Sequence, residues 1–384
     1  MKKVVVLGCG RVGAGMARDL ADDPAFDVAV ADLSAESLGR LAQRGDITSV
    51  PVDLSSAAAI STAVSTCDLV IGALPSRLGM TALRAVIEAG KPYCDISFMD
   101  DDALELDDLA RERGVTAVVD NGVAPGLSNM IVGCVSAILD KTEWVDICVG
   151  GLPKSPQWPF QYKAPFAPSD VIEEYTRPAR LVERGRVVVK EPLSEPELIR
   201  LPRAGELEAF NTDGLRSLIR NVRADAMRER TLRYPGHAEL MRVFRETGLF
   251  RLDPIDVAGA MVRPRDLTAR LLFPMWRLEE GEAEFTVMRV VVEGLRDGRR
   301  ERHTYDLYDE TDASTGMTSM ARTTGFPNTI VARMIARGDV SEPGVFAPEQ
   351  LGQRPGVLDH VLSELRRRGI DVQSAVEHLG GPAL

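Results

Sequence analysis

The sequence predicts a two-domain α/β protein in which a doubly wound parallel sheet is joined to a second domain of the α+β class. Three observations predict this fold. The first 32 residues run in the order strand, glycine-rich turn, helix, strand and acid. Short apolar runs then alternate with helical segments of about ten residues up to about residue 125, which is typical of a parallel sheet. Longer strand-like runs follow beyond residue 140, and a chain of 384 residues is too long for one ordinary core.

The N-terminal segment has the order that a dinucleotide-binding βαβ unit, the start of a Rossmann domain, requires. The apolar run Val4–Leu7 ends in Gly8-Cys9-Gly10-Arg11-Val12-Gly13, a helical stretch follows to Leu20, and the run Val28–Ala31 ends in Asp32. Gly8 allows the tight turn, Gly10 lets the backbone approach a pyrophosphate, and Gly13 lets the helix pack close to the strand. The pyrophosphate would meet the free N–H groups at the helix start. A glycine-rich turn in another kind of α/β protein is the alternative.

Asp32 predicts NAD as the cofactor. A carboxylate at this position can accept hydrogen bonds from both ribose hydroxyls of the adenosine, and it would repel a 2′-phosphate. Leu33, Ser34 and Ala35 follow, so no adjacent arginine or lysine neutralises such a phosphate.

The α/β rhythm predicts further strands whose carboxyl ends would line the cofactor crevice. Val52 and Asp53 could reach the adenine edge, and Ala73, Leu74 and Pro75 offer a small apolar surface for the nicotinamide half. The predicted helices cover residues 35–43, 56–65, 80–88 and 103–113, and the predicted strands cover 49–53, 68–75, 92–95 and 116–120. The predicted cofactor residues are Gly8, Gly10, Arg11, Val12, Gly13, Asp32, Val52, Asp53, Ala73, Leu74 and Pro75.

Two carboxylates, Asp95 and Asp120, follow the last two of these strands. Each is a candidate catalytic group at the far side of the crevice. Each is also an ordinary residue for a helix N-cap or a turn, and the two interpretations stay open.

The pattern changes after Asp120 and predicts a strand-rich second domain. A helix is expected over 130–139 and strands over 144–150, 283–293 and 302–308, with Asp297-Gly298 as the centre of a hairpin turn. The irregular segment 153–168 is a candidate substrate loop or lid. A helix over 317–337 is expected to pack back on the first domain, and a short tail with one helix near 357–368 ends the chain. The predicted domains are 1–125 with 317–345, then 126–316, then a tail over 346–384.

Composition is typical of a cytoplasmic enzyme. The chain has 46 basic and 57 acidic residues, a net charge of -11, which argues against nucleic acid or an anionic membrane as a partner. Five cysteines without a CxxC motif and only four histidines predict reduced thiols and no metal site. No apolar run approaches the length of a membrane span or of a secretory signal. We expect a homo-oligomer that acts on a small amino-acid substrate.

Four further motifs carry a resemblance to a known family. They occur in this order: Gly122–Gly126 (Gly-Val-Ala-Pro-Gly), Gly150–Pro153 (Gly-Gly-Leu-Pro), Leu207–Gly214 (Leu-Glu-Ala-Phe-Asn-Thr-Asp-Gly) and Thr231–His237 (Thr-Leu-Arg-Tyr-Pro-Gly-His). Together they resemble the saccharopine dehydrogenase family, over the chain up to about residue 370. The resemblance implies a dinucleotide domain, a mixed α/β substrate domain and a C-terminal helix that returns to the first. It also implies NAD(P)-linked oxidation at a carbon–nitrogen bond of lysine or of a lysine adduct.

The chain looks most like the lysine 6-dehydrogenase branch, because Ala124-Pro125-Gly126 stands where the glutamate-forming enzymes typically carry Asp-Pro-Gly. Against that branch, Asn211-Thr212-Asp213-Gly214 differs from the His-Thr-Ser-Gly of the lysine enzymes. Asp213 could hold an ammonium group, or it could indicate another amine. Membership of this branch would imply an enzyme that oxidises lysine and releases ammonia and a semialdehyde, which can close to a ring.

The resemblance places Arg233 at the substrate, where its planar fork would bind the α-carboxylate, with Asn211, Thr212 and Asp213 nearby. A structural arginine in a core ion pair is the alternative. The base that takes the amine proton is Asp120, Asp95 or His237, in no fixed order. His237 would share a helix face with Arg233 if the segment were helical, but Pro235-Gly236 favours a turn equally. A buried structural histidine is an equal alternative to the catalytic role of His237.

Two other functions stay open. Saccharopine dehydrogenase proper would need a second carboxylate site, for which Arg216, Arg220 and Lys163 are candidates. A non-enzymatic NAD-binding regulator would be favoured if Asp120, Arg233 and His237 lay apart.

Overall fold

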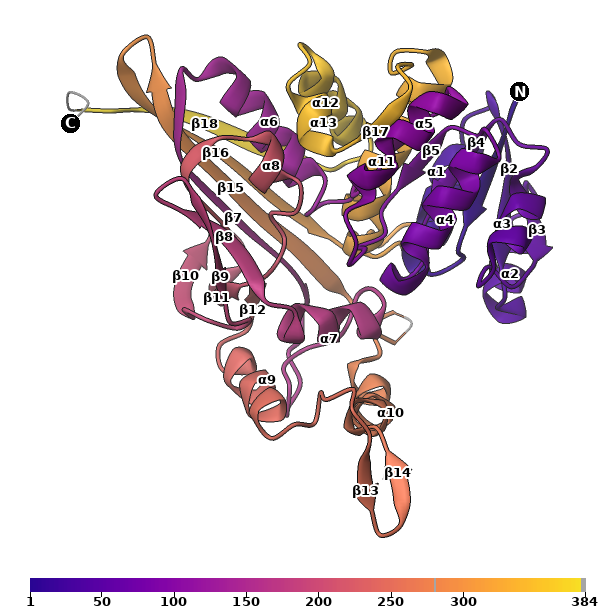
Figure 1. Ribbon diagram of the computed structural model, residues 1–384, viewed down its shortest axis with the longest axis horizontal. Helices are drawn as coiled ribbons and strands as arrows, with labels where there is room; N and C mark the ends of the chain where they lie inside the picture. Colours follow the sequence, from indigo (N-terminus) through magenta and orange to yellow (C-terminus); the bar gives the residue numbers. More distant parts are fainter. Residues whose placement is uncertain (280, 381–384) are drawn as a thin grey trace. The chain divides into compact units, whose positions relative to one another are not determined.

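The computed structural model describes residues 1–279 and 281–380, and the chain divides into two compact units. Unit 1 comprises residues 1–137 and 320–371. Unit 2 comprises residues 138–319 together with the segment that begins at Val372. Figure 1 labels the elements of both units.

Unit 1 is built on a seven-stranded sheet in the order β17-β6-β5-β4-β1-β2-β3, in which every pairing is parallel. This is the predicted doubly wound sheet. Its strands are β1 (Lys2–Leu7), β2 (Phe26–Asp32), β3 (Ile47–Pro51), β4 (Leu69–Gly72), β5 (Tyr93–Asp95), β6 (Thr116–Val118) and β17 (Gly344–Phe346). Its helices are α1 (Arg11–Ala21), α2 (Ala35–Ala42), α3 (Ala57–Val64), α4 (Ser76–Glu88), η1 (Ala103–Leu106), α5 (Asp107–Arg113), α6 (Leu127–Ile138), α11 (Ser319–Arg337), α12 (Pro348–Gly352) and α13 (Val357–Arg367).

Helix α11 returns to the first unit, as the sequence predicted. Asp19 on α1 accepts hydrogen bonds at 2.7 Å from Arg333 on α11 and from Arg368 just after α13. One carboxylate of the N-terminal helix therefore holds two arginines from the far end of the chain.

The expected separate tail over 346–384 does not form in the described residues. Phe346 ends β17, which pairs with β6 in the sheet of unit 1, and α12 and α13 belong to the same unit. β18 (Val372–Leu379) pairs instead with β16 in unit 2. The strand partners of β17 and β18 lie far away in the sequence, so the local sequence does not show which sheet each strand joins.

Unit 2 is built on a nine-stranded mixed sheet, which confirms the α+β class of the second domain. The main path runs β10-β11-β12-β7-β15-β16-β18, and β8 and β9 attach beside β12. The strands are β7 (Lys141–Pro153), β8 (Ala179–Glu183), β9 (Arg186–Lys190), β10 (Glu197–Leu201), β11 (Gly205–Asn211), β12 (Ala224–Arg233), β15 (Glu284–Arg296), β16 (Arg299–Glu310) and β18. The helices are α7 (Pro168–Thr176), α8 (Leu218–Asn221), α9 (His237–Glu246) and α10 (Pro264–Trp276), and a small hairpin, β13 (Ile255–Val257) and β14 (Ala260–Val262), forms a sheet of its own.

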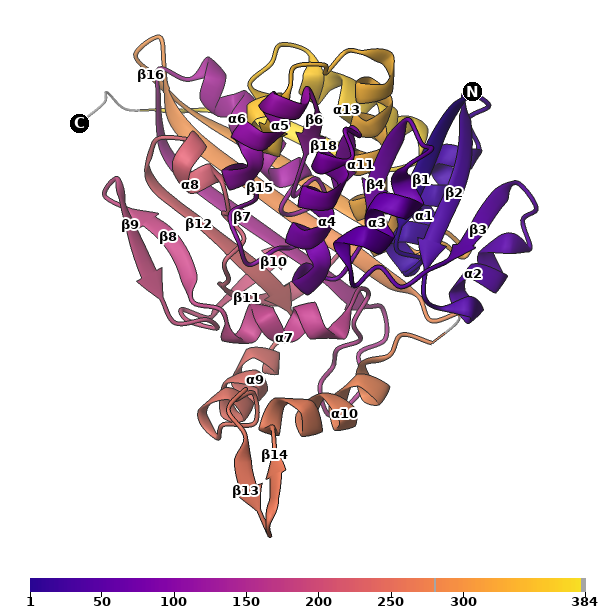
Figure 2. The same cartoon turned by 45° about the vertical axis from the view of Figure 1, so that its right-hand side comes forward.

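The predicted hairpin turn at Asp297-Gly298 is confirmed. Arg296 pairs with Arg299 across the turn, and both central residues have positive φ, 51° at Asp297 and 73° at Gly298. Positive φ at both positions is the geometry that matches the twist of a two-residue hairpin. Figure 2 shows the two long strands, β15 and β16, that this turn connects.

The segment 153–168, the candidate substrate loop or lid, contributes to the core of unit 2. Phe160 and Tyr162 are buried and pack edge-on against Trp276, at ring-centroid distances of 5.9 and 5.6 Å. The aromatic side chains that suggested a substrate loop instead anchor an irregular segment in an apolar cluster.

Within residues 1–279 and 281–380, no helix combines the length and the apolar character that crossing a membrane requires. In the same described residues, no group of three or more histidine, cysteine, aspartate or glutamate side chains is placed to hold a metal ion.

Candidate active site

The glycine turn joins β1 to α1 where the strand order of the seven-stranded sheet reverses, between β1 and β4. Gly8 has a φ of +105°, and a Cβ there would lie 2.5 Å from the carbonyl oxygen of Ala73. A Cβ on Gly13 would lie 2.1 Å from the carbonyl oxygen of Gly8, whereas a Cβ on Gly10 would have no neighbour within 4 Å. Gly8 and Gly13 are therefore required by close packing, while Gly10 leaves space at the start of α1.

The first turn of α1 is suited to an anion. Gly10 is its N-cap, Arg11 and Val12 are its first two residues, and the turn contains no acidic residue. Backbone N–H groups and the helix dipole favour a phosphate at such a position.

Asp32 ends β2 beside this turn. Its Oδ2 accepts a hydrogen bond from the backbone N–H of Cys9 at 2.5 Å, and its Oδ1 accepts one from Ser34 at 2.7 Å. Burial and the Asp32 carboxylate raise the pKa of the Cys9 thiol to about 11, against the opposing influence of Arg40 and Arg18. The carboxylate thus lies beside the glycine turn, with two arginines in the same neighbourhood.

Ala73, Leu74 and Pro75 lie at the end of β4, next to the glycine turn. The N–H of Ala73 donates to the carbonyl of Leu7 at 2.9 Å, and both Ala73 and Leu74 lie within 3.5 Å of the position that a Cβ on Gly8 would take. Pro75 is the N-cap of α4. The structure therefore brings Ala73 and Leu74 next to the glycine turn, with Pro75 directly after them.

Val52 and Asp53 differ in their placement. The N–H of Val52 donates to the backbone carbonyl of Asp32 at 3.0 Å, so the end of β3 lies beside Asp32. Asp53 is exposed, and its Oδ1 accepts a hydrogen bond from the Ser55 N–H at 2.9 Å, which lowers the pKa of Asp53. Asp53 therefore serves a local turn.

These features fit a dinucleotide. The open space at Gly10, the anion-suited start of α1 and the carboxylate of Asp32 are what the pyrophosphate and the adenosine ribose need.

Asp95, the last residue of β5, is a buried carboxyl beside this cradle. Its Oδ1 accepts hydrogen bonds from the hydroxyls of Tyr93 at 3.1 Å and Ser97 at 2.9 Å. Its Oδ2 has no hydrogen-bond partner among the described residues. Burial raises the pKa of Asp95 to about 6, and the carboxylate of Asp120 adds to the increase. A carboxyl with this pKa can exchange a proton near neutral pH.

Asp120 lies close enough to Asp95 for their charges to repel, so the structure brings these two candidates together. Asp120 is buried and has a φ of 51°, in the left-handed region that aspartate tolerates better than most residues other than glycine. Ser97 links Asp95 to the cradle, because its hydroxyl also lies 3.0 Å from the carbonyl of Leu74.

Two buried amides, Asn121 and Asn328, lie near the same strand end, and sequence reasoning missed both. The Nδ2 of Asn121 lies 3.3 Å from the Sγ of Cys94, which in turn lies 3.5 Å from the carbonyl of Asn328 on α11. Among the described residues, Asn121 Oδ1 and both side-chain polar atoms of Asn328 have no hydrogen-bond partner. Buried polar atoms of this kind are usually completed by water or a ligand.

His237 and Arg233 lie in unit 2 and do not share a helix face. Arg233 ends β12, and a turn separates it from His237 at the start of α9. The ring nitrogens of His237 lie 2.8 Å from the Tyr175 hydroxyl and 2.8 Å from the Phe160 carbonyl. Burial and the charge of Arg233 lower the pKa of His237 to about 3. As a candidate base, His237 is therefore corrected to a buried structural histidine, because it cannot take a proton near neutral pH.

Arg233 is only 2% exposed and is engaged by protein groups. Its Nη2 donates to Glu174 at 2.6 Å, its Nε donates to the Tyr175 hydroxyl at 3.2 Å, and its Nη1 donates to the Leu232 carbonyl at 2.9 Å. Its guanidinium also lies 4.5 Å from the centre of the Tyr162 ring. These contacts support the alternative of a core ion pair, and substrate binding by Arg233 stays a prediction.

Asn211, Thr212 and Asp213 are also held by neighbours in unit 2. Asn211 donates to Glu195 at 2.9 Å, and the Thr212 hydroxyl donates to Glu229 at 2.6 Å. Both oxygens of Asp213 accept hydrogen bonds from Arg180, each at 2.8 Å. Arg180 therefore pairs with the carboxylate that we considered for an ammonium group, and that role of Asp213 stays a prediction.

Glu229 is a second buried carboxyl that the sequence did not single out. Its Oε2 accepts hydrogen bonds from Thr212 and from the N–H of Gly214 at 3.0 Å, and a Cβ on Gly214 would lie 2.3 Å from its carboxyl carbon. Burial raises the pKa of Glu229 to about 8, so the group is mainly protonated at pH 7. The missing Cβ at Gly214 of the Asn-Thr-Asp-Gly motif is what makes room for it.

Arg177 lies close to Arg180, Asp213 and Arg216. Burial and the neighbouring Arg216 lower the pKa of Arg177 to about 10, with Arg180 adding to the decrease and Asp213 opposing it. We call Arg177, Arg180 and Arg216 the arginine cluster. Arg216 was a predicted candidate, and Arg177 and Arg180 were missed. Lys163 lies elsewhere, donating to the Arg277 carbonyl at 3.1 Å, and Arg220 lies on α8.

Comparison with known proteins gives the same two-part organisation. Residues 4–118 match the saccharopine dehydrogenase NADP binding domain, and residues 122–370 match the saccharopine dehydrogenase C-terminal domain. Carboxyaminopropylagmatine dehydrogenase of Synechocystis is 24% identical, with 92% of this chain and 94% of that protein covered. The NADP-dependent, L-glutamate-forming saccharopine dehydrogenase of Pyricularia oryzae is 23% identical, with 98% and 99% covered.

The fold is likewise shared with the apo saccharopine dehydrogenase of Saccharomyces cerevisiae, with a TM-score of 0.79, 19% identity and coverage of 98% of this chain and 100% of that one. The family acts as oxidoreductases on CH–NH donors of amino-acid or amine substrates. Because the two domain matches together span nearly the whole chain, this protein belongs to the saccharopine dehydrogenase family.

Proposed function

We propose that the protein is an NAD-dependent dehydrogenase that oxidises the ε-carbon–nitrogen bond of L-lysine, giving 2-aminoadipate 6-semialdehyde and ammonia. One observation carries the proposal. Asp95, a buried carboxyl with a pKa of about 6, lies at the end of β5. The neighbouring strand β4 ends beside the glycine turn, and the Ser97 hydroxyl lies within hydrogen-bond distance of both Asp95 and the Leu74 carbonyl. A proton acceptor therefore lies beside a dinucleotide cradle.

The chain's own residues supply the base and the orientation. NAD, when bound, would accept the hydride. The ε-amine must be neutral for hydride to leave its carbon, and Asp95 takes the proton as the carbon–nitrogen double bond forms. Water then hydrolyses the resulting imine, or the α-amine closes a ring. The resemblance of Ala124-Pro125-Gly126 to the lysine 6-dehydrogenases supports lysine as the amine.

The arginine cluster favours a second candidate, a saccharopine-like secondary amine. Such a substrate carries additional carboxylates, and the guanidinium groups of Arg177, Arg180 and Arg216 lie close together in unit 2. The names of the Synechocystis and Pyricularia relatives also point to substrates in which an amine is joined to an amino acid.

The experiment that separates these candidates is an assay of the purified protein with NAD and either L-lysine or saccharopine. Formation of the reduced cofactor is followed by its absorbance, and ammonia and glutamate are measured in the same samples. We expect lysine to reduce NAD with one ammonia released per turnover. Faster turnover of saccharopine with glutamate release would establish the second candidate. If neither amine reduces NAD or NADP, the proposed function is wrong.

A substitution at Asp32 tests the proposed preference for NAD over NADP. Asp32→Ala is expected to raise KM for NAD and to narrow the preference over NADP, because the carboxylate no longer accepts ribose hydroxyls or repels a 2′-phosphate. Arg18 and Arg40 lie near the same turn, so the variant should gain activity with NADP as well as lose it with NAD. The matched control is Asp27→Asn on the same strand, which should leave both constants unchanged. Equal use of NAD and NADP by the unmodified protein would contradict the assignment.

A further inference from the structure

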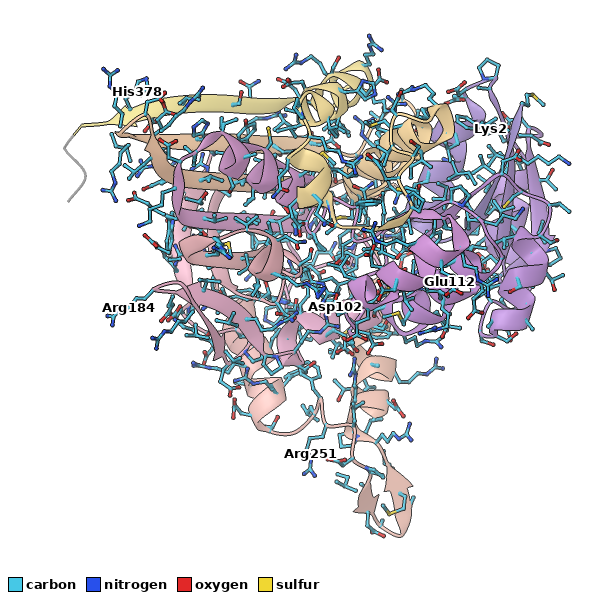
Figure 3. All side chains as sticks on the ribbon, turned by 45° about the horizontal axis from the view of Figure 1, so that its top comes forward. Lys2, Asp102, Glu112, Arg184, Arg251 and His378 are labelled. Carbon is cyan, nitrogen blue, oxygen red and sulfur yellow. The ribbon has the colours of Figure 1, made fainter. Side chains whose placement is uncertain are left out.

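Glu229 is a buried carboxyl group of unit 2 that is only partly satisfied by its neighbours. It lies on β12 and is 4% exposed. Figure 3 shows the side chains on the ribbon, with Arg184 labelled in the turn that follows β8, a strand that pairs with β12. The hydrogen bonds from the Thr212 hydroxyl at 2.6 Å and from the Gly214 N–H at 3.0 Å both end at Oε2 of Glu229. Within the part of the chain that the structure describes, no hydrogen bond ends at Oε1, and buried polar atoms of this kind are usually completed by water or a ligand.

Glu229 is mainly protonated at pH 7. Burial, together with the negative charges of Glu174 and Asp213, raises the pKa of Glu229 to about 8, although the hydrogen bonds from Thr212 and Gly214 oppose the increase. Because Oε2 already accepts two hydrogen bonds, the proton belongs on Oε1. The side chain is therefore an uncharged acid whose proton has no acceptor among the described residues.

Thr231 places a second polar atom beside this acid. Glu229 and Thr231 are two residues apart on β12, so their side chains leave the sheet on the same face. The hydroxyl oxygens of Thr212 and Thr231 lie 2.9 Å apart. The Thr212 hydroxyl has one proton, which it donates to Glu229, so Thr231 is the donor of the second bond and its lone pairs remain available. An ionised Glu229 and the Thr231 hydroxyl can thus both accept hydrogen bonds from one cation.

The charges around Glu229 favour a positively charged ligand. Glu174 on α7 and Asp213 in the loop after β11 are the charged groups that act most strongly on Glu229, and both raise its pKa. A bound ammonium group would replace the proton and would be stabilised by the same two acids, whereas they would repel a carboxylate. On the neighbouring strand β7, the residues opposite Glu229 and Thr231 are the apolar Ile147 and Val149. The charged residues of the other surrounding elements are Glu174, Arg177, Arg180, Asp213, Arg216 and Arg233.

We propose that Glu229 and Thr231 bind the α-ammonium group of the amino-acid substrate, in exchange for the proton that Glu229 carries in the free protein. The inference rests on the proposed oxidation of an amino acid with a terminal amine. The ε-amine must be neutral for hydride transfer, so the α-amine is the group of lysine that stays charged and needs a counter-charge. Substrate binding then releases one proton from Glu229. Because only the ionised carboxylate holds the ammonium group, the affinity for lysine should increase as the pH rises towards 8.

Isothermal titration calorimetry in two buffers of different ionisation enthalpy counts the protons released on binding. The titrations use the full chain at pH 7 with NADH, which cannot accept a hydride, so no turnover occurs. L-lysine is compared with 6-aminohexanoate, which is lysine without its α-amine. A group with a pKa of about 8 is about 90% protonated at pH 7, so lysine should release about 0.9 proton more than 6-aminohexanoate.

Glu229→Gln should abolish this difference and weaken lysine binding at pH 8 by about 10–100-fold, the loss of a hydrogen bond to a charged group. Glutamine has the shape and the donor of the protonated acid, so it can keep the bonds with Thr212 and Gly214 and should fold at pH 7 like the unmodified chain. Its affinity for 6-aminohexanoate should not change. Thr231→Val should weaken lysine binding by about 2–10-fold without changing the proton count. The matched control is Glu206→Gln, an exposed glutamate on β11 of the same unit, which should leave the binding of both ligands unchanged.

Equal proton release for lysine and 6-aminohexanoate overturns the inference, and so does an affinity for lysine that Glu229→Gln leaves unchanged at pH 8. Either result leaves the proposed function standing if lysine still reduces NAD. If saccharopine binds and lysine does not, the proposed function is wrong, and the inference stands only where saccharopine releases a proton that Glu229→Gln abolishes. Failure of both amines to bind overturns the inference as well.

Discussion

Asp95→Asn is expected to lower kcat for amine oxidation by about 10²–10⁴-fold, the usual contribution of a positioned general base. The amide keeps the shape of the side chain and can still meet the hydroxyls of Tyr93 and Ser97. It cannot take a proton. NAD binding, measured separately by titration, should change little, because Asp32 and the glycine turn are untouched.

The pH dependence gives this prediction a second readout. Burial raises the pKa of Asp95 to about 6, and the base works only in its deprotonated form. The activity of the unmodified protein should therefore fall as the pH drops below about 6, and the residual activity of Asp95→Asn should lack that limb. The control is Asp108→Asn on α5, an exposed carboxylate that should leave the profile as it is. If Asp95→Asn retains both kcat and the acid limb, the base is a different group and Asp120→Asn becomes the variant to measure.

The cofactor cradle was predictable from the sequence because its determinants are local. Gly8, Gly10, Gly13 and Asp32 lie within one βαβ unit, and each is required by backbone geometry or by the charge of the ligand. The hairpin at Asp297-Gly298 was predictable for the same reason. The order of the predicted elements also placed Asp95 at the end of a strand. It did not show that Oδ2 of Asp95 would lack a hydrogen-bond partner among the described residues.

The groups of unit 2 were not predictable in the same way, because their environment is assembled from distant segments. The partners of Arg233 come from α7 and from the irregular segment before it, more than fifty residues away. A sequence motif can mark Arg233 as important without showing whether it contacts a substrate or a buried glutamate. Glu229 and the arginine cluster became visible only once β12 and the loops beside it were placed together.

Arg233→Met is expected to lower the free energy of unfolding by about 3–5 kcal/mol, because it leaves Glu174 buried without its charge partner. Burial already raises the pKa of Glu174, and Arg233 is the main influence that opposes the increase. The double variant Arg233→Met/Glu174→Gln should recover much of the loss, since it removes both charges together. Denaturant unfolding of the three proteins at pH 7 measures these differences.

Kinetics then decide between a core ion pair and a substrate contact for Arg233. A lysine at this position keeps the charge but cannot reproduce the planar fork, so Arg233→Lys should disturb a bound carboxylate strongly. Cadaverine lacks the α-carboxylate of L-lysine and reports only on the rest of the site. If Arg233 is structural, as its contacts with Glu174 and Tyr175 indicate, Arg233→Lys lowers the activity on both amines by the same factor. A KM increase for lysine alone, in a variant of unchanged stability, would instead return Arg233 to the substrate.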